Sequence, residues 1–185
     1  RVKLTILGGG GFRTPFVWQA LIRDQATPRV TEVSLHDVAP VRLTVIHAIL
    51  DELTRESGAV QPPTLSVTTD AREALAGADF VFAAVRAGGP QGRSLDEHVA
   101  LDLGVIGQET TGPGGLAYAL RSVPVMLEYA RIIAEVAPAA YVMNFTNPAG
   151  IVTEAMQSVL GDRVLGICDT PSGMGRRIVL AAGAD

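Results

Sequence analysis

The sequence predicts an α/β protein in which helices cover both faces of a doubly wound parallel sheet. Short apolar runs alternate with longer amphipathic stretches, and this order is typical of repeated βαβ units with right-handed crossovers. The run at 80–85 is apolar throughout and the run at 2–7 nearly so, as expected of strands buried on both faces of a sheet. Glycines cluster directly after the first run.

The composition bounds the size of the protein and its partners. The 185 residues are 48% hydrophobic, which suffices for one core but not for two ordinary domains. A net charge of −4 with 15 scattered Lys and Arg residues predicts no nucleic-acid partner. No segment approaches the roughly twenty apolar residues of a membrane span, so we expect no membrane partner. The single cysteine, Cys168, suits a reducing cytoplasm.

The first unit has the order of a phosphate-binding loop: a strand over 2–7, glycines, then a helix with Thr14 as N-cap and Pro15 at its first position. The glycines are Gly8, Gly9, Gly10 and Gly11. They let the backbone approach a diphosphate, while free N–H groups and the positive end of the helix attract it. The G-x-G-x-x-G fingerprint fits only in part, because Arg13 occupies its third glycine position.

The second strand is expected at 30–35 and ends in His36 and Asp37. A carboxylate at this place accepts hydrogen bonds from the adenosine ribose hydroxyls and repels a 2′-phosphate. Asp37 therefore favours NAD over NADP as cofactor. Arg42 is near enough in sequence to soften that preference.

The remaining elements follow from the period of the apolar residues and from residues that cap or end helices. A stripe of apolar residues predicts a helix over 40–57 that Gly58 ends, and Asp70 caps a short helix over 71–75. Further helices are expected at 96–103, 116–136, 149–159 and 171–182, and further strands at 64–69, 80–85, 141–145 and 164–167. The glycine-rich stretch 86–115 is the least regular, and long connections of this kind are usually functional. Six strands with intervening helices make a Rossmann fold that binds a dinucleotide.

Ligands of such sheets bind outside the carboxyl ends of the strands. After the fourth strand come Arg86 and Arg93, which are either the grip for a phosphate or carboxylate or two solvated arginines. Glu109 lies in GQETTGPGG directly before the long helix. It could orient a substrate hydroxyl, although its segment also suits a helix-capping turn.

Two further clusters follow the last strands. Asn147 precedes a proline after the fifth strand and could bind a sugar or the nicotinamide amide, or cap the next helix. Cys168 and Asp169 follow the sixth strand, before a helix whose dipole would lower the pKa of a thiol. The cysteine is a nucleophile, a metal ligand or a small buried hydrophobe.

Together these clusters resemble the NAD-dependent glycoside hydrolases of family 4, which include 6-phospho-β-glucosidases and 6-phospho-α-glucosidases. The resemblance is carried by the segments LGGGGFRTP, AGGPQGRSLDEHVA, IGQETTGPGG, NFTNPAGIVTEA and GICDTP, in this order. It extends over essentially the whole chain. IGQETTGPGG and NFTNPAG are long enough to be specific, whereas the glycine loop occurs in many dehydrogenases.

The resemblance implies glycoside hydrolysis by elimination with no net redox change. Bound NAD⁺ would oxidise C3 of a phosphosugar, a divalent metal, most often manganese, would polarise the resulting ketone, and a tyrosine would remove the C2 proton. By this resemblance Arg93 and Asn147 bind substrate, Glu109 assists the base, Cys168 binds the metal and Asp169 donates a proton. The cofactor residues are Gly8, Gly9, Gly10, Gly11, Phe12, Asp37 and Arg42.

In this family the metal-binding histidine and the tyrosine base follow later in the chain than residue 185. We therefore expect residues 1–185 to be the N-terminal dinucleotide-binding domain of a longer enzyme, inactive alone and assembled as a homodimer or homotetramer. Two alternatives stay open. A lactate- or malate-type 2-hydroxyacid dehydrogenase shares the fold, the arginine loop and the Asn-Pro pair, but Cys168 and GQETTGPGG count against it. A non-catalytic NAD sensor would need none of the polar clusters.

Overall fold

Six parallel strands form one sheet in the computed structural model, which describes residues 1–183. Their order across the sheet is β3-β2-β1-β4-β5-β6, with each neighbouring pair parallel. The strands are β1 (Lys3–Leu7), β2 (Glu32–His36), β3 (Thr64–Thr68), β4 (Phe80–Ala83), β5 (Tyr141–Asn144) and β6 (Val164–Gly166). The order reverses between β1 and β4, so a crevice opens there at the carboxyl ends of the strands.

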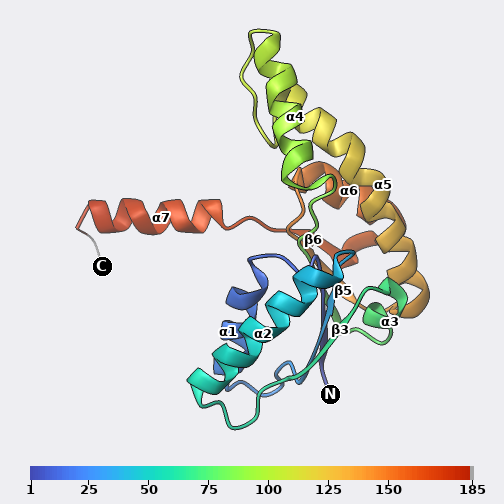
Figure 1. Cartoon of the computed structure of the whole chain (residues 1–185), viewed down its shortest axis with the longest axis vertical. Helices are drawn as coiled ribbons and strands as arrows, with labels where there is room; N and C mark the ends of the chain where they lie inside the picture. Colours follow the sequence, from blue (N-terminus) through green and yellow to red (C-terminus); the bar gives the residue numbers. More distant parts are fainter. Residues whose placement is uncertain (184–185) are drawn as a thin grey trace.

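Helices cover both faces of the sheet (Figure 1). They are α1 (Thr14–Arg23), α2 (Pro40–Ser57), α3 (Ala71–Leu75), α4 (Gly89–Asp102), α5 (Gly112–Val136), α6 (Ala149–Leu160) and α7 (Thr170–Ala181). One core cluster joins β1 and β2 to α1 and α2 around Trp18. The other joins β4 and β5 to α3, α5 and α6 around Met126 and Met156. Because side chains alternate along a strand, successive residues of β2 face different helical layers.

The doubly wound fold and all six strands confirm the sequence prediction. The stretch after β4 is more regular than expected, since α4 begins at Gly89 rather than near residue 96. Gly88, at φ +80°, turns the chain and Pro90 occupies the first turn, where a missing N–H is harmless. The prediction that Thr14 is an N-cap is wrong: it lies inside α1, and its hydroxyl donates to the Gly9 carbonyl at 2.9 Å.

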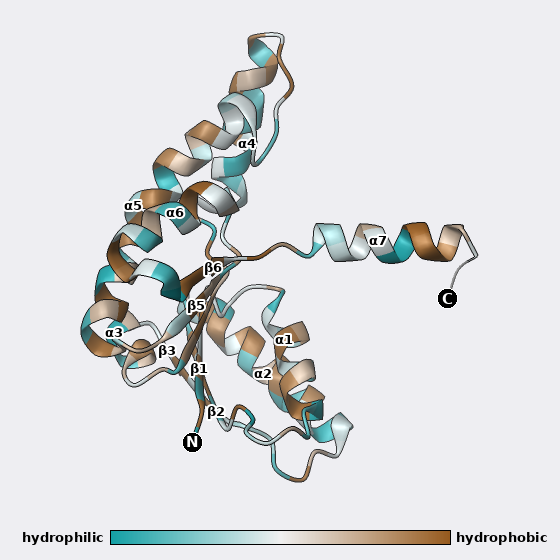
Figure 2. Ribbon diagram, turned by 180° about the vertical axis from the view of Figure 1, so that it is seen from behind, coloured by the Kyte–Doolittle hydropathy of each residue, from teal (hydrophilic) through white to brown (hydrophobic). Residues whose placement is uncertain are grey.

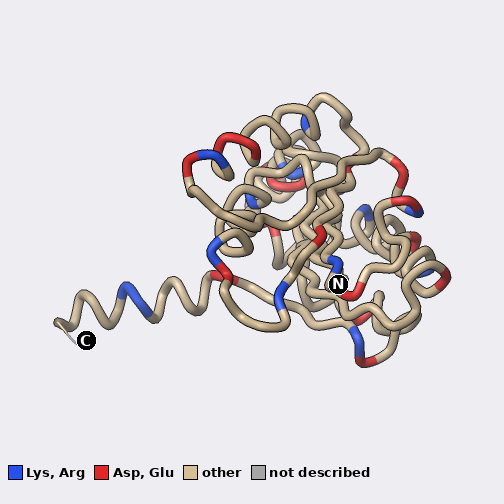
Figure 3. The backbone as a smooth tube through the Cα atoms, turned by 90° about the horizontal axis from the view of Figure 1, so that it is seen from below, with Lys and Arg blue, Asp and Glu red and all other residues tan. Residues whose placement is uncertain are grey.

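Two parts leave the compact body (Figures 1 and 2). The α4 helix and the first turns of α5 project together as an arm, and α7 extends away without a single buried residue. Acidic and basic residues are interspersed over the body (Figure 3). Within residues 1–183, none of the helices combines the length and the apolar character that crossing a bilayer requires.

Candidate functional site at the carboxyl edge of the sheet

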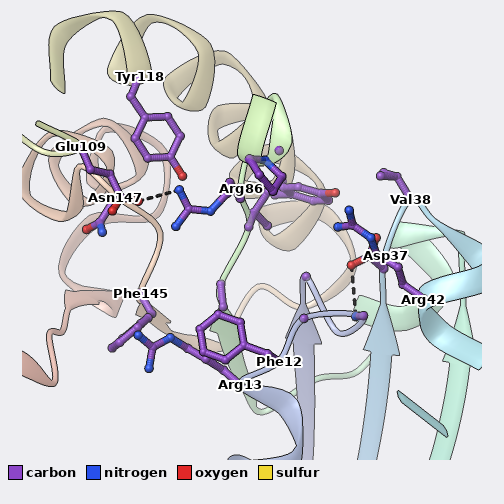
Figure 4. Close-up of a pocket in the computed structure, with 18 residues that line it drawn as sticks. Phe12, Arg13, Asp37, Val38, Arg42, Arg86, Glu109, Tyr118, Phe145 and Asn147 are labelled. Carbon is purple, nitrogen blue, oxygen red and sulfur yellow. Dashed lines mark hydrogen bonds and ion pairs between the residues drawn. The ribbon is translucent and has the colours of Figure 1, made fainter. Parts of the chain in front are cut away.

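A cavity of about 500 Å³ lies where the strand order reverses. The loops after β1, β2, β4 and β5 line it, together with the α5 helix. Figure 4 shows two groups of side chains on opposite sides of the glycine loop. Asp37, Val38 and Arg42 form one, and Arg86, Glu109, Tyr118 and Asn147 the other. We call these the aspartate end and the arginine end of the cavity.

Three glycines of the loop, Gly8, Gly9 and Gly10, are packed too closely against their neighbours for a larger residue. A Cβ at Gly8, where φ is +80°, would overlap the carbonyl oxygen of Ala84. A Cβ at Gly9 would lie 2.8 Å from Cβ of Leu35, and one at Gly10 2.7 Å from Cβ of Arg42. These contacts hold the loop against β2, the start of α2 and the residue just after β4, so the space above it stays open for a ligand.

The backbone N–H groups of the loop divide into two sets. Those of Gly8 and Gly9 both donate to the His36 carbonyl, at 2.9 and 2.8 Å, and that of Gly11 donates to Gly8. Among residues 1–183, no acceptor pairs with the N–H of Phe12 or Arg13, which stand at the N-terminus of α1. A diphosphate would therefore meet these two N–H groups and the helix dipole rather than the glycine amides themselves.

Asp37 acts first as a brace for the loop. One carboxylate oxygen accepts from the Gly10 N–H at 3.1 Å, and the other accepts from the Ala39 N–H at 3.0 Å. The carboxylate still lines the cavity, so lone pairs remain for a ribose hydroxyl. Arg42 lines the same end, beside Gly10.

The arginine end is a network of charges drawn from three segments. Glu109, mostly buried, forms ion pairs with Arg86 at 2.7 Å and with Arg93 at 3.1 Å. Arg93 also donates to Glu97 at 2.8 Å, and this bond, with the Glu109 charge, raises the pKa of the Arg93 guanidinium. Arg93 thus reaches the cavity through Glu109 and does not line it itself. The sequence clusters around residues 86–93 and 107–115 meet at this point.

A second pair supports this network from behind. Arg121 on α5 makes two hydrogen bonds to Asp96 on α4, at 2.7 and 2.6 Å, and so holds the two helices of the arm together. The Arg121 and Arg86 guanidinium carbons lie 5.6 and 5.8 Å from the centre of the Tyr118 ring. Burial raises the pKa of Tyr118, so its hydroxyl stays protonated at neutral pH.

The segment after β5 presents one of its two asparagines. Asn144 is fully buried and used structurally, since its amide bonds Thr146 and Thr153. Asn147 lines the cavity, and no side chain caps α6, so its role as a helix cap is not observed. Arg13 lies over the neighbouring Phe145 ring at 4.2 Å, and both side chains line the cavity.

Cys168 and Asp169 lie outside the cavity lining. Cys168 is exposed just after β6, which excludes the expectation of a small buried hydrophobe. The Asp169 carboxylate pairs with Arg13 at 2.9 Å, and Arg13 does line the cavity. Within residues 1–183, no three His, Cys, Asp or Glu side chains gather as a metal site.

The structure thus gathers most of the predicted site residues in one crevice. Those lining it are Gly8, Gly10, Gly11, Phe12, Asp37, Arg42, Glu109 and Asn147. Sequence reasoning missed Tyr118 and Tyr129, which also line it. Eleven residues, or three helical turns, separate the two tyrosines, so they share one face of α5. This eleven-residue spacing is the signal in the sequence that could have identified the two tyrosines.

The comparisons with known proteins agree with this geometry. A family model described as family 4 glycosyl hydrolase matches residues 3–183. A probable 6-phospho-beta-glucosidase of Bacillus subtilis is 38% identical over the whole chain, which covers 42% of that relative. The chain therefore spans less than half the length of the curated relative.

Solved structures show the same likeness. A 6-phospho-alpha-glucosidase from gut microorganisms, in complex with NAD and Mn²⁺, is 37% identical with a TM-score of 0.89 over the whole chain and 42% of its own. The 6-phospho-beta glucosidase of Thermotoga maritima with manganese, NAD⁺ and glucose-6-phosphate is 28% identical, also with a TM-score of 0.89, over the whole chain and 44% of its own. These matches leave the dehydrogenase alternative the weaker one.

Proposed function

This chain belongs to family 4 of the glycosyl hydrolases, and we propose that it is the NAD-binding part of an enzyme that hydrolyses 6-phosphoglucosides. The observation that supports the NAD-binding part of the proposal is the glycine loop, in which added Cβ atoms would collide with Leu35 of β2, with Ala84 just after β4 and with Arg42. The N–H groups of Phe12 and Arg13, which pair with no acceptor among residues 1–183, lie beside it. The glycoside-hydrolase part is supported by the family match over residues 3–183. Relatives of both anomeric types match, and we keep the β-glucoside as the favoured substrate.

The cavity fits the cofactor in size and polarity. Its 500 Å³ extends from Asp37, suited to ribose hydroxyls, to the polar groups of the arginine end. NAD⁺, when bound, supplies a hydride acceptor that takes hydride from a sugar carbon and later returns it. The preference for NAD over NADP follows from the negative charge of Asp37, which repels a 2′-phosphate.

The side chains of the arginine end would bind and orient the sugar. Asn147 offers an amide that both donates and accepts hydrogen bonds to hydroxyls. Arg93 would bind an anionic substrate, for which it must exchange its pairs with Glu97 and Glu109. Glu109, held by two guanidinium groups, would orient the reacting hydroxyl and assist the base. Asp169 would donate a proton, for which it must exchange its pairing with Arg13.

The described residues support metal binding less well than NAD binding. Cys168 would supply one thiolate, but among the described residues it belongs to no group of three His, Cys, Asp or Glu side chains that could hold a metal ion. Thiolate is also a soft ligand for a hard ion such as Mn²⁺. The described residues alone therefore do not make a metal centre.

Two further proposals concern the compartment and the oligomeric state of the enzyme. We propose a cytoplasmic enzyme, as a chain with one exposed free cysteine suits a reducing compartment. We also propose a homodimer or homotetramer, supported by exposed apolar side chains on the projecting arm, such as Leu95, Leu103 and Leu120.

The test measures binding and turnover separately. Calorimetric titration of residues 1–185 should show one NAD⁺ bound per chain and NADP⁺ bound at least tenfold more weakly. The whole polypeptide that contains these residues should release nitrophenol from a 6-phosphorylated aryl glucoside only with NAD⁺ and Mn²⁺ both present. Steady NADH consumption with pyruvate or oxaloacetate would instead favour the dehydrogenase, and absence of NAD⁺ binding would refute the proposal.

A further inference from the structure

A buried histidine and a tyrosine form a pair at the aspartate end that the proposed chemistry leaves unused. His36, the last residue of β2, is 2% exposed, and its Nε2 lies 3.0 Å from the Tyr129 hydroxyl. Tyr129 reaches it from α5 and lines the cavity. The two rings meet edge to face with centres 5.6 Å apart. The tyrosine is therefore fixed in position before any ligand arrives.

The protonation state of His36 decides whether the Tyr129 hydroxyl presents a hydrogen-bond donor or an acceptor to a ligand. Burial lowers the pKa of His36, so the ring is neutral and carries one N–H at neutral pH. A hydrogen bond from the ring to the Thr68 backbone raises the pKa of His36, but by less than burial lowers it. Nδ1 meets no well-aligned acceptor in the described part of the chain. We assign the proton to Nδ1, toward the Thr68 backbone, because a bare lone pair facing the carbonyl oxygen would be repelled.

This tautomer makes Nε2 an acceptor, so the Tyr129 O–H donates to it. The phenol stays protonated, because burial raises its pKa and the Asp37 and Glu128 charges add to that effect. The lone pairs of the Tyr129 oxygen are then left as hydrogen-bond acceptors at the cavity wall. As acceptors, these lone pairs favour a ligand N–H and repel a ligand carbonyl oxygen.

The position of the tyrosine indicates which ligand group it meets. Asp37, the residue after His36, braces the loop where the adenosine ribose is expected. The base attached to that ribose would lie among Val38, Val85 and Tyr129, which line the same cavity. Two of these side chains are aliphatic and suit the faces of a purine. Adenine carries one exocyclic amino group as donor.

We propose that the Tyr129 hydroxyl, oriented by His36, accepts a hydrogen bond from the adenine amino group and so selects adenine over hypoxanthine in the dinucleotide. The inference rests on the proposal that the cavity binds NAD. Tyr129 is then a specificity-determining residue for the cofactor, and His36 is its positioning residue.

The test is a ratio of two affinities measured by calorimetry on the same chain. NAD⁺ should bind wild type about threefold to tenfold more tightly than nicotinamide hypoxanthine dinucleotide, in which a carbonyl replaces the amino group. Tyr129→Phe should bring the ratio close to one. The matched control is Tyr118→Phe, which removes the other cavity-lining hydroxyl of α5 and should keep the wild-type ratio.

The possible outcomes distinguish a failure of adenine selection by Tyr129 from a failure of NAD binding. A wild-type ratio near one, or a Tyr129→Phe variant that keeps the ratio, would overturn the selection by Tyr129 while leaving NAD binding intact. Binding of neither dinucleotide to wild type would overturn the cavity assignment and this inference with it. Circular dichroism checks the folding of each variant, and if Tyr129→Phe does not fold, the wild-type ratio decides.

Discussion

The two ends of the cavity are built by different physical means. At the aspartate end, backbone atoms and one carboxylate make the site, and glycines pack it against β2 and β4. At the arginine end, charged side chains from three segments hold one another in ion pairs around Glu109. Backbone held by a sheet is rigid, whereas ion pairs of partly exposed side chains contribute little each. Substitutions should therefore cost much more stability at the aspartate end.

The largest effect is expected at Gly8. Gly8→Ala combines a left-handed φ with an overlap on the Ala84 carbonyl, so we expect about 3 kcal/mol of lost stability and no measurable NAD⁺ binding. Urea denaturation and calorimetry measure the two effects. Gly58→Ala is the matched control: φ is +62°, nothing lies within 4 Å of the added Cβ, and about 1 kcal/mol is expected. Equal losses in both variants would show that the loop is not tightly packed.

Removal of the Asp37 carboxylate is expected to have the next largest effect. Asp37→Ala leaves the Gly10 and Ala39 N–H groups without their acceptors, which should cost about 1–2 kcal/mol of stability. NAD⁺ affinity should fall roughly tenfold, and the discrimination against NADP⁺ should shrink because the repelling charge is gone. Titration with both dinucleotides measures this. An unchanged NAD⁺ to NADP⁺ ratio would contradict the assignment of Asp37 to the ribose.

A smaller effect is expected at the centre of the arginine end. Glu109→Gln breaks two ion pairs but leaves both arginines partly exposed to solvent, so stability should fall by about 1 kcal/mol. NAD⁺ affinity should change less than threefold, since the residue serves the sugar. Glu135→Gln, which breaks the exposed pair with Arg72, is the control and should cost less. A larger loss of NAD⁺ affinity in Glu109→Gln would show that Glu109 holds the cofactor rather than the sugar.

The smallest effect is a dependence of stability on pH. Burial lowers the pKa of His36 in the folded chain, so below about pH 6.5 the unfolded chain binds a proton that the folded chain does not. Stability should fall by up to about 1 kcal/mol between pH 7.5 and 5.5 for this reason. His36→Gln should reduce that slope in urea denaturation. His47→Gln, on an exposed part of α2, is the control, and an equal reduction there would refute the account.

The same difference explains what could be predicted from sequence. The glycine loop, Asp37 and the six strands are local patterns, because glycines, an acid at a strand end and apolar runs each mean the same thing in most contexts. The Glu109 network joins residues far apart in sequence, and either partner alone resembles a solvated charge. The start of α4 was not predictable, because glycines at 88, 89 and 92 suggest a loop. In the structure Arg121 of α5 lies beside Gly88 and Gly92 and bonds Asp96, and this contact stabilises a helix there.

Tyr129 was missed for a related reason. Its importance comes from His36, 93 residues earlier, which the sequence shows only as a polar residue at a strand end. The position of Asp169 was also not foreseeable, because its pairing with Arg13 joins residues 156 apart.

The most direct measurement is a crystal structure of the chain with NAD⁺ bound. The account predicts the diphosphate at the backbone N–H groups of Phe12 and Arg13, the adenosine ribose at Asp37 and the nicotinamide toward Glu109 and Asn147. A diphosphate bound elsewhere, or a nicotinamide at the aspartate end, would contradict it.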